Sequence, residues 1–328
     1  MTPFRSDRLS ESVSRAAFRR RLLIWYKRNR RDLPWRKDRN PYHVWVSEIM
    51  LQQTRVAAVL AHYSAFLLRF PDVKSLARAR ESSVLAAWSG LGYYRRARML
   101  HQSARKIVSE REKKFPATAK AWRELPGIGR YTAAAIASIA FGEPSAVVDG
   151  NVERVLDRVF GKHLRGETRW QVAQELLSPQ YPGDFNQAMM ELGATVCLPS
   201  QPDCAACPVS AFCFTRGPLA KSGNSTRQKR RDIHYVLDLA DDSVFLQQRP
   251  KTASLMPGMW ELPEVPPRHG SGPSLILRHS ITDTDYRVHV SRCAAPPAAA
   301  GRWVATDRAT ALPLTGLTRK ILRAARVI

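Results

Sequence analysis

The chain has 328 residues, enough for two or three domains, and its 52 Lys and Arg against 28 Asp and Glu give a net charge of +24. An excess of this size favours a polyanionic partner, because a protein that neutralises phosphates releases their counterions. No long apolar run, amphipathic anchor or signal-peptide core is present, which argues against a membrane protein and predicts a cytoplasmic, nucleoid-associated one. The Arg-rich start is also compatible with organelle import, which is the alternative.

The first two thirds of the chain are predicted to be helical. Apolar side chains recur at helical spacing, and Gly and Pro punctuate the segments. No strand-like alternation of any length occurs before residue 214. The predicted helices cover 13–28, 44–69 with a break near 52–54, 81–88, 94–112, 130–141, 151–159, 170–177 and 185–196.

The last third has a different pattern. Residues 215–232 are polar, basic and poor in apolar groups, which is typical of a linker. Beyond them the sequence predicts strands near 235–239, 244–249, 274–279 and 286–291, a turn at Asp241-Asp242 and a closing helix over 315–326. We therefore expect a mainly α region over 1–214, a linker, and a smaller α+β domain over 233–328.

The stretch LPGIGR at 125–130 predicts a tight turn before a helix. Gly127 and Gly129 let the chain turn and expose backbone N–H groups, to which the following helix adds its positive N-terminus. This arrangement suits a DNA phosphate without any base contact. An ordinary connection between two helices is the alternative.

Two carboxylates are candidates for chemistry. Glu48 has apolar neighbours along its predicted helix, so burial would raise its pKa and suit a general acid. The alternative is a surface glutamate. Asp149 follows the apolar run at 146–148 and precedes a helix, where capping is the commoner explanation of an aspartate.

Four of the five cysteines fall in one short segment. Their spacing is Cys197-x6-Cys204-x2-Cys207-x5-Cys213, and Cys293 stands alone. In a reducing compartment such clustering favours metal or cluster ligation over disulfides. Four thiolates can surround a four-iron cubane, and the spacing favours this 4Fe-4S cluster over the alternative, a tetrahedral zinc site.

Several separated motifs together resemble one family. VSEIMLQQT (46–54), LPGIGRYTA, VDGNVERVL (148–156), FNQAMMELG (185–193) and the cysteine quartet are similar to MutY-type adenine DNA glycosylases. That family belongs to the helix-hairpin-helix superfamily, which includes endonuclease III. The resemblance is dense from about residue 18 to 213. It implies a six-helix barrel, a cluster domain, and removal of adenine opposite 8-oxoguanine or guanine from double-stranded DNA after base flipping.

The resemblance also implies roles for individual residues. Glu48 would protonate the adenine and later take a proton from water, and Asp149 would stabilise the sugar cation. Tyr131 and Asn151 would line the sugar side. Tyr131 has no amine and cannot form a Schiff base, which indicates a monofunctional glycosylase. Weak, incidental strand cleavage by a lysine elsewhere in the cleft is the alternative. The other implied positions are Trp35, Arg36 and Glu191 around the adenine, and Gln53, Leu91 and Tyr93 near the opposing base. Core packing for Trp35 and a surface charge for Arg36 are the alternatives.

Residues 233–328 resemble the Nudix-like domain that reads 8-oxoguanine in this family. No glutamate-rich hydrolase segment follows 258–263, so nucleotide hydrolysis is not expected. The family commonly has Phe-Ser-His after an Arg-His pair, whereas here Arg278-His279-Ser280 precedes Ile281-Thr282-Asp283. Thr282 can hydrogen-bond a base edge, but the carboxylate of Asp283 replaces a ring donor. We expect altered or weakened reading of 8-oxoguanine.

The sequence thus predicts a monomeric, monofunctional adenine glycosylase that acts on double-stranded DNA. A glycosylase of the same fold that removes thymine opposite guanine is the nearest alternative. A non-catalytic iron–sulfur DNA-binding protein is another, although DNA binding alone requires neither Glu48 nor Asp149.

Overall fold

The structure is a computed structural model that describes residues 12–110, 114–218, 229–267, 274–281 and 284–328. The chain divides into two compact units, Met1–Gln53 with Lys106–Ser222 and Thr54–Arg105 with Gly223–Ile328, and each is described by itself. Within the described ranges, no helix is long and apolar enough to cross a membrane. The predicted domain limits stay a prediction.

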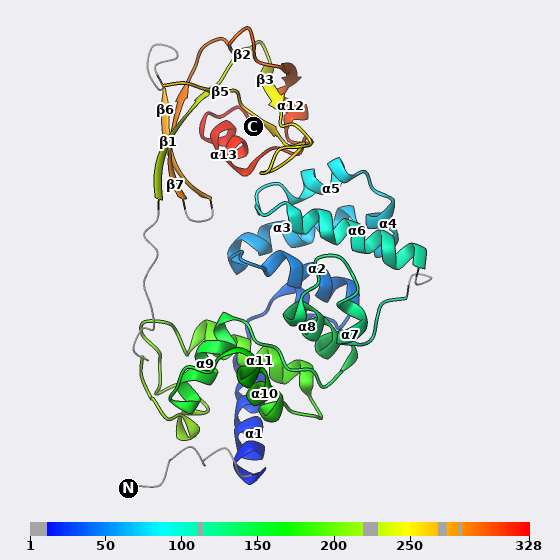
Figure 1. Cartoon of the computed structure of the whole chain (residues 1–328), viewed down its shortest axis with the longest axis vertical. Coiled ribbons are helices and arrows are strands. Elements are labelled where there is room, and N and C mark those ends of the chain that lie inside the picture. The colour runs from blue at the N-terminus through cyan, green and yellow to red at the C-terminus, as the bar shows by residue number, and fades with distance from the viewer. Residues whose placement is uncertain (1–11, 111–113, 219–228, 268–273, 282–283) are drawn as a thin grey trace. The chain divides into compact units, whose positions relative to one another are not determined.

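The first unit is helical, and its helices match the predicted ones closely (Figure 1). Helices α8 and α9 both end at a glycine in the left-handed conformation, Gly142 and Gly161, which stops each helix without a Cβ penalty. The elements are α1 (Ser12–Asn29), η2 (Pro34–Arg36), α2 (Pro41–Leu51), α7 (Ala119–Trp122), α8 (Arg130–Phe141), α9 (Gly150–Phe160), α10 (Gly166–Leu176), α11 (Pro182–Thr195) and η3 (Ser210–Phe212).

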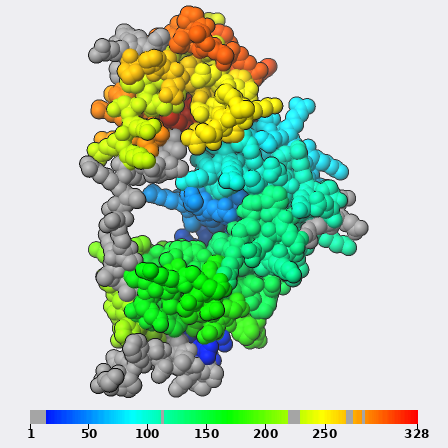
Figure 2. Space-filling view, viewed as in Figure 1, coloured from blue at the N-terminus to red at the C-terminus, as the bar shows by residue number. Residues whose placement is uncertain are grey.

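Helix α11 packs closely against α8 and α9 because two of its positions lack a side chain. A Cβ at Gly183 would lie 2.6 Å from the carbonyl oxygen of Ser138 in α8. A Cβ at Gly193 would lie 2.6 Å from Cβ of Asn151 in α9. The residues of α11 between these glycines therefore reach the interior of the unit. Side chains fill the space between the helices, and the green residues form a continuous packed mass in the space-filling view (Figure 2).

The second unit contains helices α3 (Val56–Arg69), α4 (Val73–Arg78), α5 (Glu81–Trp88) and most of α6 (Arg95–Glu110). The break predicted near 52–54 is confirmed, since it separates α2 from α3. Asp72 forms a capping box with Ser75 at the start of α4. The rings of Phe66 and Trp88 pack edge to face, with their centroids 5.8 Å apart.

The rest of this unit is an α+β region with two small sheets around a core that includes Val244, Val288 and Ile321. One sheet has the order β5-β1-β7-β6, and in the other β3 pairs with β2, β4 and β8. The elements are β1 (Lys229–Val236), β2 (Leu239–Ala240), β3 (Ser243–Gln248), β4 (Trp260–Glu261), β5 (Glu264–Val265), β6 (Leu275–Ile281), β7 (Thr284–Ser291), β8 (Gly301–Ala305), α12 (Thr306–Ala309) and α13 (Gly316–Ala324).

The predicted strands and the closing helix of this region are observed, and the structure adds the short elements β4, β5 and α12, which were not predicted. Strand β1 begins at Lys229, inside the range predicted as linker, because its polar residues pair in parallel with β7 from Lys229–Thr284 onward. Strand β8 was not predicted either. It follows an Ala- and Pro-rich tract, and it is recognised as a strand because it pairs with β3. Pairing with a distant strand can make a strand of a segment whose own residues do not indicate one.

Candidate active site

Glu48 lies on the buried face of α2, and only 6% of the residue is exposed. The Tyr131 hydroxyl donates a hydrogen bond to its Oε2 at 3.0 Å. Burial raises the pKa of Glu48 to about 7, against the opposing effects of this hydrogen bond and the charge of Arg36. The negative charge of Asp149 adds to the rise. The predicted burial of Glu48 is confirmed, and its carboxyl group can carry a proton near neutral pH.

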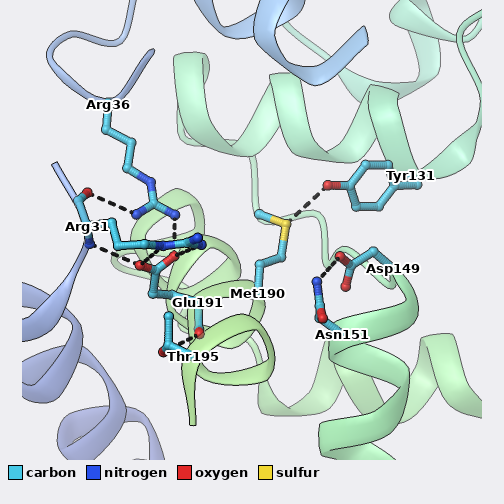
Figure 3. A network of polar contacts seen from close by, with 8 residues as sticks. All are labelled: Arg31, Arg36, Tyr131, Asp149, Asn151, Met190, Glu191 and Thr195. Carbon is cyan, nitrogen blue, oxygen red and sulfur yellow. Dashed lines mark hydrogen bonds and ion pairs between the residues drawn. The ribbon is translucent and has the colours of Figure 1, made fainter. Parts of the chain in front are cut away.

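Tyr131 projects from the first turn of α8, and its hydroxyl also lies 3.1 Å from the Met190 sulfur of α11 (Figure 3). Burial and the charges of Glu48 and Asp149 raise the pKa of Tyr131 well above its usual value. The phenol therefore stays neutral and acts as a donor. No amine occupies this position.

Asp149 is the N-cap of α9, so the capping interpretation is confirmed. Its Oδ1 accepts a hydrogen bond from the Val152 backbone N–H at 2.7 Å. Its Oδ2 accepts one from Asn151 Nδ2 at 3.1 Å (Figure 3). Arg154 in turn donates to Oδ1 of Asn151 at 2.8 Å, and to the carbonyl oxygens of Gly193 and Cys197. The carboxylate is thus fixed in orientation while the residue remains partly exposed.

Glu191 is a second buried carboxylate, with no exposed surface. Arg31 donates to both of its oxygens at 2.8 Å, and Arg36 donates to Oε2 at 2.8 Å (Figure 3). Burial alone would raise the pKa of Glu191, but these bonds outweigh it and lower the pKa to about 2. Glu191 is therefore a fixed anion whose charge is neutralised by two guanidinium groups.

The structure brings two of the three residues expected around the adenine into direct contact, Arg36 and Glu191. Trp35 lies beside Arg36 in the short helix η2 and is 7% exposed, which is compatible with packing. The guanidinium of Arg36 also lies over the Tyr26 ring, 5.6 Å from its centroid. Arg36 is therefore held from two sides and is not a free surface charge.

The predicted turn between α7 and α8 has the expected backbone. Gly127 has a φ of +74°, which other residues rarely adopt, and Gly129 is the N-cap of α8. Both glycines are exposed, and no side chain caps this helix start. Arg130 pairs with Glu167 at 2.6 and 2.8 Å and lies over the Trp170 ring. The open N-terminus can accept an anion such as a phosphate.

The residues expected near the opposing base differ in exposure. Gln53 is exposed and has a φ of +55°, while Tyr93 is 45% exposed with a φ of +47°. Leu91 is only 5% exposed. Positive φ angles at residues other than glycine cost energy and cluster at functional sites. Thr282 and Asp283 lie outside the described residues.

The loop around Tyr93 is held by Arg96. Its guanidinium donates to Thr54 Oγ1 at 2.9 Å and to the carbonyl oxygens of Leu91 and Gly92 at 3.3 Å. It also lies over the Tyr93 ring, 5.3 Å from the centroid. One cation therefore supports a loop in which Gly90, Gly92 and Tyr93 all have positive φ.

The four clustered cysteines line one small cavity in the loop after α11. Arg158 of α9 donates to Sγ of Cys197 at 3.2 Å and to the carbonyl oxygens of Leu198 and Pro199 at 2.7 Å. The thiol of Cys213 donates back to the Arg158 carbonyl at 3.3 Å. Among the described residues, no three His, Cys, Asp or Glu side chains are grouped closely enough to hold a single metal ion.

Several residues of the site were missed by sequence reasoning. Arg31 is a partner of Glu191 across 160 positions of the chain, and nothing in its surroundings sets it apart from the other arginines of a basic segment. Met190 precedes Glu191 in the motif FNQAMMELG, which is a signal that could have indicated it. Arg154 and Arg158 lie in the helix that begins after Asp149, and their contacts with the cysteine loop required the fold.

Comparisons with known families and proteins agree with this geometry. Residues 46–180 match the family described as HhH-GPD superfamily base excision DNA repair protein. A human protein named adenine DNA glycosylase is 50% identical over 215 residues, which cover 61% of this chain and 39% of the human one. An Arabidopsis thaliana protein of the same name is 45% identical over 294 residues, which cover 74% of this chain and 46% of the Arabidopsis protein. The chain thus spans about two fifths to one half of the length of these curated relatives.

Solved structures give the same architecture. A thermostable thymine-DNA glycosylase aligns with a TM-score of 0.58 and 31% identity. The alignment covers 62% of this chain and 96% of the thymine-DNA glycosylase chain. An endonuclease III in a non-covalent complex with DNA aligns with a TM-score of 0.52 over the same shares. At 21% identity, this second likeness speaks for the fold alone.

Proposed function

The chain belongs to the HhH-GPD superfamily of base excision DNA repair proteins and, within it, to the adenine DNA glycosylases, and on this premise we propose that it excises mispaired adenine. The proposed reaction is hydrolysis of the N-glycosidic bond of adenine opposite 8-oxoguanine or guanine in duplex DNA. The observation that carries the proposal is Glu48, a buried carboxyl group with a pKa near 7 beside the fixed carboxylate of Asp149.

The two carboxyl groups have complementary roles in this reaction. Protonated Glu48 delivers its proton to the adenine ring, which makes the base a better leaving group. Ionised Asp149 stabilises the positive charge that develops on the sugar, as in glycoside hydrolysis. Glu48 then accepts a proton from the attacking water. A pKa raised to about 7 lets the Glu48 carboxyl group give up and take back a proton near neutral pH, which serves both steps.

Tyr131 limits the reaction to base removal. Strand cleavage through a Schiff base needs an amine beside the sugar, and a neutral phenol occupies this position. Its hydrogen bond keeps the carboxyl group of Glu48 oriented. Asn151 orients Asp149 in the same way. The enzyme is therefore monofunctional and stops at the abasic site.

Double-stranded DNA is the proposed partner. The open N-terminus of α8, with Gly127 and Gly129, binds a backbone phosphate, and the net charge of +24 adds attraction that does not depend on sequence.

Trp35, Arg36 and Glu191 surround the flipped adenine. Gln53, Leu91 and Tyr93 fill or probe the gap near the opposing base. We propose that the protein works as a monomer on nucleoid DNA in the cytoplasm.

We also propose that the four cysteines from Cys197 to Cys213 hold a 4Fe-4S cluster. They line one cavity, and four thiolates can surround a cubane whose irons each take one sulfur ligand. The cluster would order a loop rich in proline and support DNA docking. Iron and sulfide analysis tests the proposal, and colourless protein with stoichiometric zinc would contradict it.

Thymine excision opposite guanine is the second candidate, because a thymine-DNA glycosylase shares this fold at 31% identity. Glu48 disfavours it, and the relatives with 45–50% identity are named for adenine. A panel of duplexes with A opposite 8-oxoguanine, A opposite G, and T opposite G separates the two. Replacement of Ile281-Thr282-Asp283 by Phe-Ser-His tests the preference for 8-oxoguanine over guanine.

A further inference from the structure

The segment 143–148, which leads into Asp149, belongs to no helix or strand. It connects α8 with α9, and Ala146 and Val147 are almost completely buried. Buried backbone N–H and C=O groups need hydrogen-bond partners. Since no neighbouring strand is paired with this segment, its partners must come from elsewhere.

Two side-chain amides supply them, one on each side of the segment. Gln174 of α10 accepts a hydrogen bond from the Ala146 N–H at 2.9 Å and donates to the Pro144 carbonyl at 2.7 Å. Asn186 of α11 accepts from the Val147 N–H at 3.3 Å and donates to the Ser145 carbonyl at 2.8 Å. Gln174 thus bonds residues 144 and 146, and Asn186 bonds residues 145 and 147, so the two amides together satisfy backbone groups that no strand partner satisfies.

We propose that Gln174 and Asn186 are positioning residues that set where the Asp149 carboxylate stands relative to the sugar. The inference rests on the proposed function. Asp149 follows the pinned segment by two residues, and its own bond to Val152 fixes the other side. A small displacement of a reacting group can cost a large factor in rate, so loss of either amide should slow base release.

Gln174 is the better residue to test. Asn186 is buried and also donates to Ser138 Oγ at 2.9 Å, so replacing it would disturb α8 as well. Gln174 is exposed and lines an open groove of about 890 Å³, where a substitution is tolerated. Gln171 lies on the same helix, lines the same groove, is also exposed and takes part in none of these bonds. It provides the matched control.

The experiment compares wild type, Gln174→Met and Gln171→Met on a duplex with adenine opposite 8-oxoguanine. We expect Gln174→Met to lower the single-turnover rate of adenine release about tenfold, because two hydrogen bonds are lost. Binding of a duplex with an abasic-site analogue should stay within about twofold of wild type, since the fold and the DNA surface are kept. The Ala146 amide should exchange with solvent faster, which reports the lost bond independently of activity.

Two further arms make the result decisive. Gln174→Glu keeps the acceptor for Ala146 but loses the donor to Pro144, so its rate should fall between wild type and Gln174→Met. Faster Ala146 exchange without a slower reaction would overturn the inference, as would an equal loss of rate in Gln171→Met. If wild type released no base from any mispair, the proposed function itself would fail, and this inference with it.

Discussion

Glu48 and Glu191 are two buried carboxylates of one compact unit, yet their pKa values are about 7 and about 2. Burial raises both, so burial alone does not explain the difference. The hydrogen-bond partners do: a neutral phenol contacts Glu48, whereas two guanidinium groups contact Glu191. The comparison teaches that two buried carboxyl groups differ in charge near neutral pH because one is hydrogen-bonded to a neutral phenol and the other to two guanidinium groups.

The largest effect is expected from Glu48→Gln. The amide keeps the shape of the side chain but cannot deliver a proton, so single-turnover release of adenine should fall about a thousandfold. The free energy of unfolding should not fall, because a buried charge is removed. Release of adenine is measured as alkali-labile strand breaks. Full activity in this variant would show that the mechanism assigned to Glu48 is wrong.

Glu191→Gln should act on stability instead. It leaves two guanidinium groups without their common anion, which should cost about 3 kcal/mol in the free energy of unfolding. Urea denaturation measures this loss. Glu175→Gln is the control, because Glu175 is an exposed partner of Arg15 at 3.4 Å and should cost less than about 1 kcal/mol. Equal losses in the two variants would remove the distinction between buried and surface pairs.

The pH dependence should differ between the two carboxylates. The folded-state pKa of Glu48 is raised above its usual value of 4.5, so its contribution to stability is complete below pH 4.5 and is lost as the pH rises through 7. The loss amounts to about 3 kcal/mol. Glu191, with a lowered pKa, contributes above pH 4.5 and loses its contribution as the pH falls towards 2.

Unfolding free energies of wild type and Glu48→Gln between pH 4.5 and 8 test this directly. The difference between the two proteins should shift in favour of the variant as the pH rises, and become constant above about pH 8. The rate of adenine release by wild type should also fall above pH 7, where Glu48 loses its proton. A difference in stability that does not change with pH would contradict the raised pKa.

The smallest effect is expected from Tyr131→Phe. The hydroxyl lowers the pKa of Glu48, so its removal should raise that pKa further. The alkaline limb of the pH–rate profile should move to higher pH, with a change in rate at pH 7 of less than about fivefold. An unmoved profile would mean that Tyr131 does not act through Glu48. Strand cleavage should be absent in both proteins, since neither has an amine there.

Much of the helical fold could be predicted from local signals. Helix α8 was predicted with its observed bounds because Gly129 and Gly142 flank an apolar run and both glycines act as caps. Strand β8 could not be predicted in this way. Its residues follow a tract rich in Ala and Pro, and it exists through its pairing with β3, which is more than fifty residues away in sequence.

The candidate site shows the same limit. Apolar neighbours in its helix were enough to predict that Glu48 is buried, and the residues before and after Asp149 predicted its capping role. The contacts that give each carboxylate its pKa join segments far apart, as with Arg31 and Glu191 or Tyr131 and Glu48. A single sequence identifies which residues carry charge, but not which of them meet.

Helix α11 places Met190 and Glu191 at adjacent positions, one beside Tyr131 and the other beside the two arginines, and its glycines leave little room for adjustment. Inherited substitutions in this helix should therefore affect two contacts at once. A displacement that weakens the ion pairs of Glu191 with its two arginines also disturbs the contact of Met190 with the Tyr131 hydroxyl. Selection cannot readily change the ion pairs of Glu191 without also changing the contact between Met190 and Tyr131. Variants classed as merely unstable by an expression screen can carry a hidden catalytic defect when they fall between Gly183 and Gly193.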